Sequence, residues 1–478
     1  MKSAEDEQPV SARTRLLRQI LQGKGKLASG EAVGRRSGAR RVLSPTQERM
    51  WFLEQLTPGT TMHNLGCALW LGGPLDVRAL ECALTEITRR HEVLRSIYRP
   101  SGGDLEVVLL ESNVSLVADR LTPEPGRAEE EQAADLCERI AGERIDVTRS
   151  RPVRFHLLRL SERRHVLALV CHHIAYDGWS QGIFLRELSA LYADQLAGRR
   201  SSLPEPPLQY ADFAEWDRTR KQRVADTEAL RFWLDRLSAQ TEPLDLPTSQ
   251  SRPAAPSYAG RTFRFVVDPE LTRALAMLAR NQSKSLFSVL MAGYQLLLAK
   301  LARQRDVVTG TAVAHRTRQE LEQVIGPFVN TVPIRSTVDM AQSFVAYLDR
   351  ISVTCADALA HQEVPFEQIV KALNPPRDRD SFPIYQTMLT LQNYPQDAPR
   401  MEHLDVECRL LSSHTSRFDL ALILEPRAGA LDAAMEFRTE LFDDQRIEWF
   451  ASSFLALLRS ATRAPNTPIG KLSMRSPR

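Results

Sequence analysis

A short apolar run that ends in two consecutive histidines constrains the fold of this 478-residue chain more than any other feature. The run, residues 165–171, is partly β-branched and has the length of a buried strand. Apolar side chains then recur at helical spacing over residues 184–192. We therefore expect a strand, a short loop and a helix in succession, a scaffold that holds loop side chains in a fixed direction.

The loop between these elements carries side chains suited to acyl transfer. His172 and His173 follow the strand, and Asp177 and Gly178 precede the helix, which Ser180 is expected to cap. A histidine has a pKa of about 6.5, so near neutral pH it can accept a proton from a nucleophile and return it to a leaving group. An aspartate can fix the tautomer of an imidazole, or pair with an arginine and lock the loop.

Two adjacent histidines at a strand end also suit an ordinary loop, but the full pattern His-His-x-x-x-Asp-Gly favours a functional site. This pattern is the hallmark of the condensation domains of nonribosomal peptide synthetases, and the chain resembles that family in further motifs. Thr46 and Glu363 depart from the usual residues, and the last motif is loose. In family order, these motifs lie at residues 43–53, 90–96, 210–216, 325–335, 361–367 and 377–384.

The resemblance implies an α/β fold of two chloramphenicol-acetyltransferase-like subdomains, arranged as a V-shaped pseudo-dimer with one active site at their junction. Strands that alternate with helices, and a length too great for one core, agree with two such parts. We expect a flexible basic segment at residues 1–42, which includes a helical candidate at 14–21. The N-terminal subdomain with the histidine loop would follow at 43–242, and the C-terminal subdomain at 243–478, after a Pro-rich linker.

The resemblance also assigns roles to the loop residues. His173 is expected to be catalytic, either deprotonating the nucleophile or positioning it against the donor thioester. His172 is expected to hold the loop. Asp177 is expected to support the loop through a salt bridge, with Arg335 as its partner, and Gly178 to leave room for the pantetheine arm of the donor.

Three further residues have two interpretations each. Trp179 and Ser180 either line the donor channel, or pack and cap the helix. Asn330 offers a polar contact inside the tunnel or makes a turn hydrogen bond. The other motif residues that we single out are expected to be structural: Gln47, Arg49, His91, Arg95 and Glu367.

The implied chemistry needs no bound cofactor and no metal. The donor acyl group arrives as a thioester on the 4'-phosphopantetheine arm of a peptidyl carrier protein. The acceptor is either bound to a second carrier protein or is a small-molecule amine or alcohol. An α-amine has a pKa of about 7.7 to 8.0, so positioning can supply much of the rate, whereas an alcohol depends more on a base.

Composition argues against several other classes. The net charge is +3 and its excess is local, since residues 1–42 hold ten Lys or Arg against four Asp or Glu, which gives no case for nucleic acid. The six cysteines lack C-x-x-C spacing, so neither a zinc site nor a disulfide framework is indicated. No apolar run approaches the roughly 20 residues of a membrane span. We expect a cytoplasmic monomer.

Within the family, the intact loop argues against heterocyclization domains. Motifs typical of epimerization domains are missing, and so is the second His-His motif of dual epimerization and condensation domains. Cys171 stands where β-lactam-forming relatives have an additional histidine. The first two motifs and the Asp-Gly-Trp-Ser ending resemble the subtype that joins two L-configured units.

The sequence thus predicts a condensation enzyme that transfers a carrier-bound acyl or aminoacyl group to an amine or alcohol. No adenylation domain or carrier attachment site occurs in it. If 478 residues is the natural length, we expect a free-standing enzyme, which the start at Met1 favours; if the sequence is one domain of a longer chain, we expect the next carrier-bound amino acid as acceptor. Two alternatives stay open. One is a catalytically silent platform that recruits a tailoring enzyme to a carrier protein, although the histidine loop is typically altered in such platforms. The other is a small-molecule acetyltransferase, which would resemble only one half of the chain.

Overall fold

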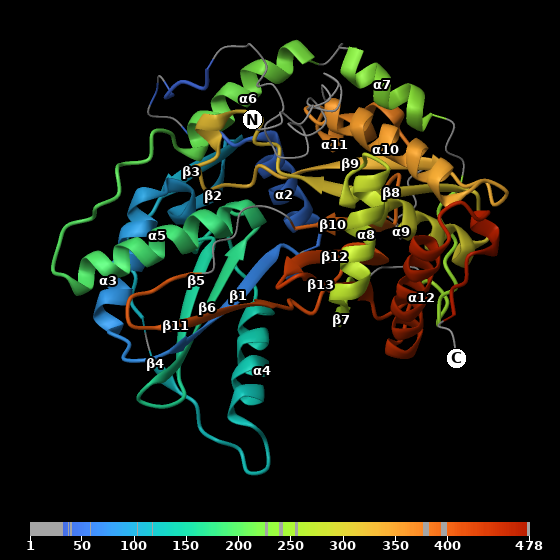
Figure 1. The fold of residues 1–478 in the computed structure, drawn as a ribbon. Helices are drawn as coiled ribbons and strands as arrows, with labels where there is room; N and C mark the ends of the chain where they lie inside the picture. The colour runs from blue at the N-terminus through green and yellow to red at the C-terminus, as the bar shows by residue number, and fades with distance from the viewer. Residues whose placement is uncertain are drawn as a thin grey trace, which may run out of the picture.

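The computed structural model of the chain consists of two α/β halves that lie side by side, each built around one mixed sheet (Figure 1). The predicted α/β class is confirmed. The structure describes residues 32–36, 38, 41–57, 59–102, 104–116, 118–224, 228–238, 242–253, 257–375, 382–392 and 399–475.

The first sheet carries the histidine loop at one end of its middle strand. Its strand order is β11-β1-β6-β5-β4, and every pair is antiparallel except β4 with β5. Since β6 pairs with β1 on one side and β5 on the other, its end is fixed by the sheet. In the same order, the strands span Asp405–Leu411, Asn64–Gly72, Arg164–His172, Val153–Arg159 and Ala118–Arg120.

Both faces of β6 are covered, which explains why its sequence is continuously apolar instead of alternating. Leu167 belongs to the core that the sheet forms with α3 (Val77–Arg90) and α5 (Gly178–Leu196). Ala168 belongs to a separate cluster on the other face, where α4 (Glu129–Ala141) packs. The strand predicted before the two histidines is therefore β6, and the helix predicted after them is α5.

The remaining elements of this half surround the sheet. Helix α2 begins with a capping box, in which Ser44 accepts from the backbone of Gln47 and the Gln47 side chain accepts from the backbone of Ser44. Helix α6, the short helix η1 and strands β2 and β3 also pack outside the sheet. Their bounds are Pro45–Leu56 for α2, Glu92–Arg95 for η1, Ser96–Ser101 for β2, Asp104–Leu109 for β3 and Tyr210–Val224 for α6.

The second sheet has the order β7-β13-β12-β10-β8-β9, and β10 runs parallel to both of its neighbours. Along this order the strands span Gly260–Val267, Ala430–Arg438, Leu420–Arg427, Thr387–Leu391, Asp306–Val313 and Asn330–Thr337. The helices of this half are α7 (Glu228–Leu237), α8 (Pro269–Asn281), α9 (Leu286–Ala302), α10 (Phe344–Ala360), α11 (Phe366–Leu373) and α12 (Asp444–Arg463), with the short η2 (Gln319–Leu321) and η3 (Ile469–Lys471).

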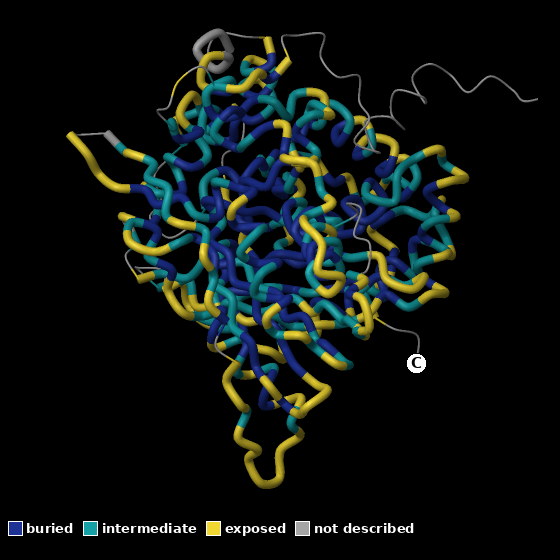
Figure 2. Tube along the Cα trace, turned by 90° about the vertical axis from the view of Figure 1, so that its left-hand side faces the viewer, coloured by how far each residue is buried: buried dark blue, intermediate teal, exposed yellow. Residues whose placement is uncertain are grey.

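Helix α9 forms the centre of the second core. It contacts α8, α10 and α12 as well as strands β8 and β10, and almost all of its residues are buried. A helix that is apolar on every side is expected where it is covered on every side. Figure 2 shows where the described residues are buried, with buried segments in the middle and exposed ones at the periphery.

Strand β11 joins the two halves. It comes from the second half of the sequence, yet it pairs with β1 along the edge of the first sheet, with Cys408 opposite Leu69. A division of the chain at residue 243 therefore assigns β11 to the C-terminal subdomain, although the strand belongs to the first sheet. The two halves share a hydrogen-bonded sheet, so their relative position is fixed by more than side-chain packing.

Part of the segment expected to be flexible, residues 1–42, packs on the first half. Val33 is buried in the first core. Arg36 forms ion pairs with Glu92 and Asp212, and Arg41 forms another with Glu92. These contacts hold residues 32–36 and 41 against the first half. The helical candidate at residues 14–21 lies outside the described residues.

None of the helices in the described part of the chain has both the length and the apolar composition to cross a membrane by itself. Helices α8 and α9 satisfy that combination only as a pair, and the pair is bent by 109°.

Candidate active site

Backbone hydrogen bonds fix the loop at both histidines. The N–H of His172 donates to the carbonyl oxygen of Pro152, and the N–H of His173 to that of His63, each at 2.7 Å. The N–H of Ala175 then donates back to the carbonyl oxygen of His172 at 3.0 Å, which closes a turn. His63, the residue just before β1, therefore holds the backbone of His173, and β1 is the strand next to β6 in the sheet.

Asp177 caps helix α5. Its Oδ1 accepts from the backbone N–H of Ser180 at 2.8 Å and from the Ser180 hydroxyl at 2.7 Å. The prediction that Ser180 caps the helix is wrong, because the capping oxygen lies three residues earlier in the chain. The negative charge at this end also suits the helix dipole.

A buried ion pair connects Asp177 to the second half. Nη2 of Arg316 lies 3.1 Å from Oδ1 of Asp177, and the two side chains are 1% and 3% exposed. The backbone N–H of Phe328 donates to Oδ2 at 3.0 Å. Nη1 of Arg316 donates to two backbone carbonyls, those of Leu321 and Val324, at 2.6 Å each. Asp177 thus holds the loop against residues 316–328, which agrees with the supporting role expected for Asp177.

Arg335 is not the partner of Asp177, and that prediction is wrong. Its guanidinium donates to the two carboxylate oxygens of Asp306 at 2.9 and 2.7 Å. Arg335 lies in β9 opposite Val308 of β8, so Asp306, two residues away along β8, faces the same side of the sheet. The cross-strand neighbour takes the guanidinium, and Arg316, which no motif includes, takes the place expected for Arg335.

Trp179 and Ser180 contact the same segment as Asp177. Nε1 of Trp179 donates to the carbonyl oxygen of Glu322 at 3.1 Å. The hydroxyl oxygen of Ser180 accepts from the N–H of Gly326 at 3.0 Å and lies 3.1 Å from the carbonyl oxygen of the same residue. These contacts agree with packing roles. A channel role for Gly178, the first residue of α5, and for Trp179 stays a prediction.

Asn330 fastens the start of β9 to the start of α11. Its Nδ2 donates to the carbonyl oxygens of Gln362 and Val364 at 2.8 and 2.9 Å. Its Oδ1 accepts from the N–H of Phe366 at 3.2 Å. Both ends of this amide are therefore used within the protein, which favours the structural interpretation of Asn330 over a tunnel contact.

Burial keeps the imidazole of His173 neutral. It lowers the pKa of His173 to about 4, although the charge of Asp177 opposes the shift. Nδ1 of the ring is buried and has no hydrogen-bond partner among the described residues. At neutral pH such a ring offers one nitrogen lone pair as a hydrogen-bond acceptor. Because it resists protonation, it is better suited to holding a nucleophile than to storing its proton.

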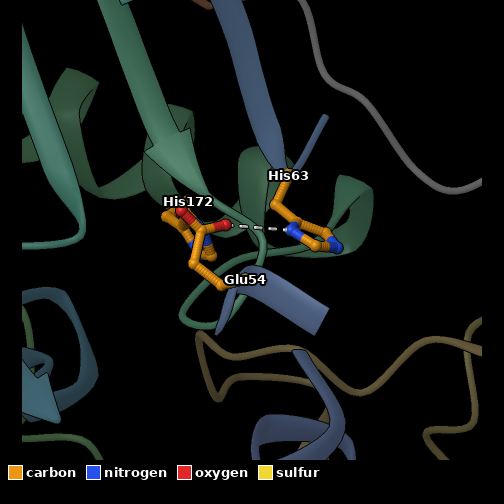
Figure 3. Close-up of side chains that lie close together, drawn as sticks. All are labelled: Glu54, His63 and His172. Carbon is orange, nitrogen blue, oxygen red and sulfur yellow. Dashed lines mark hydrogen bonds and ion pairs between the residues drawn. The ribbon is translucent and has the colours of Figure 1, made fainter. Parts of the chain in front are cut away.

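A carboxylate and two imidazoles lie against the loop (Figure 3). Oε2 of Glu54, from α2, lies 3.4 Å from Nδ1 of His63 and 3.6 Å from Nε2 of His172. All three side chains are at most 3% exposed. Burial would raise the pKa of Glu54, but hydrogen bonds from His172 and His63 outweigh it and lower the pKa to about 2. The carboxylate is therefore ionised.

These three residues meet the distance requirement for a metal ion, since their ligand atoms lie within 4.8 Å of one another. Hydrogen bonding argues against one. Nδ1 of His172 accepts from the N–H of Ile174 at 3.1 Å, which places the proton of the neutral ring on Nε2, toward Glu54. A metal ligand needs a lone pair at that atom and a donor at the other nitrogen. The residues fit a carboxylate between two imidazole N–H groups better than a metal centre.

Three residues of this site carry no signal in the motifs. Glu54 directly follows the first motif, His63 is an isolated histidine, and Arg316 precedes the fifth motif. The pairing of β1 with β6 sets Asn64 opposite His172, and this register is what brings His63 to the loop. A search for polar residues just outside each motif could have found Glu54, but the register of strands is not readable from motifs.

Comparison with known proteins identifies the family of the chain. The family model of the condensation domain matches residues 40–478. The chain belongs to the condensation domain family. The resemblance expected from the motifs is confirmed.

The relatives are parts of large synthetases. The chain is 37% identical over 435 residues to chondramide synthase of Chondromyces crocatus, a match that covers 90% of this chain and 11% of the synthase. It is 33% identical over 442 residues to phosphinothricin tripeptide synthetase of Streptomyces viridochromogenes, covering 90% of this chain and 40% of that protein. The chain therefore spans less than half of the length of either relative.

Solved structures show the same fold. The X-domain from teicoplanin biosynthesis superimposes with a TM-score of 0.83 at 28% identity, covering 93% of this chain and 100% of that one. The same kind of domain in complex with OxyB gives 0.82 at 27% identity, covering 94% and 99%. The first condensation domain of the calcium-dependent antibiotic synthetase, with a substrate analogue, gives 0.78 at 21% identity over 91% and 100%, which shows the fold alone.

The two arginines should differ in their importance for the stability of this condensation domain. Arg316→Gln leaves the carboxylate of Asp177 buried and unpaired, so we expect the free energy of unfolding to fall by about 3 to 5 kcal/mol. Arg335→Gln, the matched control, removes a pair in which Asp306 is 39% exposed, and should cost about 1 kcal/mol. Urea unfolding measures both. Equal losses, or a larger loss for Arg335→Gln, would contradict the assignment of the pair.

Acid should destabilise the condensation domain through the buried His63 and the partly buried His173. Burial lowers the pKa of His63 and of His173 to about 4, so the unfolded chain binds more protons than the folded one below pH of about 6.5. Their contribution to stability is complete above that pH and is lost as pH falls toward 4. From pH 7 to 5 the loss should be about 2 kcal/mol per histidine. Unfolding in urea at the two pH values tests it.

His63→Gln should remove part of this pH dependence. His403→Gln is the control, since His403 is 70% exposed and should leave the dependence unchanged. The prediction is contradicted if the free energy of unfolding is the same at pH 7 and pH 5, or if His63→Gln leaves its pH dependence unchanged. Either result would show that the folded protein does not hold these rings neutral.

Proposed function

We propose that this condensation domain is an active acyltransferase, which moves an acyl or aminoacyl group from a carrier protein to an amine or alcohol. The observation that carries the proposal is the intact histidine loop. In it, His173 is neutral and fixed through its backbone, and the loop ends at the buried ion pair between Asp177 and Arg316. A loop kept for packing alone has no need of a partly exposed imidazole whose buried Nδ1 has no hydrogen-bond partner among the described residues.

The proposed reaction uses the lone pair of His173 to orient the nucleophile. An N–H or O–H of the acceptor donates to the ring while its lone pair attacks the carbonyl carbon of the donor thioester. As the new bond forms and the thiolate leaves, the proton of the acceptor passes to the leaving sulfur. Because the pKa of His173 is lowered to about 4, the ring removes protons poorly. We therefore expect amines, of which a fair fraction is neutral near pH 7, to react faster than alcohols.

The expected partners follow from the family. Condensation domains work with carrier proteins, and the substrate is presented on the phosphopantetheine arm while nothing is bound to the domain itself. The acceptor, the free-standing state, the monomer and the preference for two L-configured units remain predictions. Charge complementarity with an acidic carrier would speed encounter, and the basic residues of the first 42 are one place to look for it.

A platform that recruits a tailoring enzyme is the second candidate. What supports it is the similarity to the X-domain from teicoplanin biosynthesis, whose complex with OxyB has been solved. A platform needs a surface for its partner and has no requirement for a neutral imidazole at the junction of the halves. The two candidates therefore differ in whether His173 matters.

The deciding experiment measures acyl transfer by intact mass. Carrier proteins loaded with acyl or aminoacyl groups are mixed with soluble and carrier-bound amines and alcohols. We expect transfer by the wild type, with amines ahead of alcohols, and a fall of at least about 100-fold for His173→Ala. His403→Ala, which alters an exposed histidine, is the matched control and should retain the full rate.

Carrier binding without transfer to any acceptor, and unaffected by His173→Ala, would contradict the enzymatic proposal and favour the platform. Transfer that survives His173→Ala would contradict the role given to His173 while leaving the acyltransferase in place.

A further inference from the structure

We infer that Glu54 is a positioning residue for His173, because its carboxylate holds the two histidines that fix the His173 backbone on either side. No motif includes Glu54 or His63. The inference deepens the proposed function and rests on it only for the consequence for rate, since the arrangement itself can be tested without any substrate.

The first connection runs through the side chain of His172. Its Nε2 faces Oε2 of Glu54 at 3.6 Å, and its Nδ1 accepts from the N–H of Ile174 at 3.1 Å. The ring therefore bridges from the carboxylate to the residue that follows His173. Only the tautomer with the proton on Nε2 satisfies both contacts, because Nδ1 must keep its lone pair for the backbone donor.

The second connection runs through the backbone of His63. Nδ1 of its ring faces the same carboxylate oxygen at 3.4 Å, while its carbonyl oxygen accepts from the N–H of His173 at 2.7 Å. The rings of His63 and His172 lie 5.5 Å apart at 51°, on two sides of the carboxylate. One carboxylate therefore orients both residues that hold the peptide of His173, and it does so from a third element, α2.

Charge explains why a carboxylate stands here. An ionised oxygen makes a stronger hydrogen bond with Nδ1–H of His63 than a neutral amide oxygen would, and its charge also attracts the Nε2–H of His172 at 3.6 Å, beyond hydrogen-bond distance. The pKa of Glu54 is lowered to about 2 and that of His63 to about 4, so near neutral pH one negative charge faces a neutral His63 ring. The other oxygen of Glu54 lies 3.6 Å from Nε of Arg144, whose side chain is 42% exposed.

A metal ion is the rival explanation for the same three side chains, and the hydrogen bonds disfavour it twice. Binding through Nε2 of His172 would reverse the tautomer set by Ile174. Binding through Nδ1 of His63 would move the proton to Nε2, which is buried and has no hydrogen-bond partner in the part of the chain that the structure describes. A metal-bound histidine normally donates its second N–H to an acceptor.

The test begins with the wild-type protein labelled with ¹⁵N at histidine. We expect His172 to show a protonated Nε2 and an unprotonated Nδ1, and His63 the reverse. His63→Gln and His172→Gln assign the two sets of signals. Glu54→Gln, which keeps the shape of the side chain but removes its charge, should mix the tautomers of His63, while His172 keeps its tautomer because the N–H of Ile174 still donates to its Nδ1. Glu48→Gln, an exposed position on the same helix, should change neither.

The consequence for rate follows from the transfer assay. We expect Glu54→Gln to lower kcat by about 10-fold to 100-fold, as a small misplacement of a catalytic ring does, with KM for the loaded carrier unchanged. Glu48→Gln should retain the wild-type kcat. A loss confined to KM, or no loss in a protein that still unfolds cooperatively, would contradict the positioning role.

Two results would overturn the inference without reference to activity. One is the opposite tautomer in either ring of the wild type. The other is zinc that binds at one ion per chain and is lost in Glu54→Gln, which would identify a metal centre. If the wild type transfers no acyl group at all, the proposed function fails, and the tautomer measurement still decides the arrangement around Glu54.

Discussion

The buried ion pair between Asp177 and Arg316 is the contact on which the geometry of the site depends. It joins the loop to residues 316–328, a segment that connects β8 to β9 of the second sheet and packs its apolar side chains in the first core, and the two charged side chains are at most 3% exposed. Replacing a pair of this kind by apolar residues can leave stability unchanged, so we infer that its value lies in fixing one arrangement and not in its net energy. Because Asp177 also caps α5, the ion pair sets the direction in which the helix and the loop leave the sheet.

Three elements then determine where His173 lies. The sheet fixes the N–H of His173 through His63, and α2 supplies Glu54. The ion pair with Arg316 fixes the end of the loop through Asp177. Strand β11 adds a further constraint, since it ties the second half to the edge of the first sheet. A site placed between two halves is sensitive to their relative position, and these contacts restrict that position at several points. The outcome is a neutral imidazole in a fixed place, which suits a reaction whose donor is already activated as a thioester.

The sequence predicts those features that depend on local pattern. The apolar run before His172 is β6, and the helical spacing after the loop is α5, because periodicity and length reflect burial directly. Partners across the fold could not be predicted in this way. Arg335 belongs to a motif and was the natural choice for Asp177, but β9 sets it beside Asp306 while the segment before the motif brings in Arg316.

A double-mutant cycle on Asp177 and Arg316 tests most directly whether this pair controls the loop. Asp177→Asn keeps a capping side chain, Arg316→Gln removes the cation, and the double variant has no unpaired charge. If the pair is coupled as described, the double variant should lose less unfolding free energy than the sum of the single variants, by about 2 kcal/mol or more. Losses that add to within about 0.5 kcal/mol would show that the two residues act independently and would contradict the account.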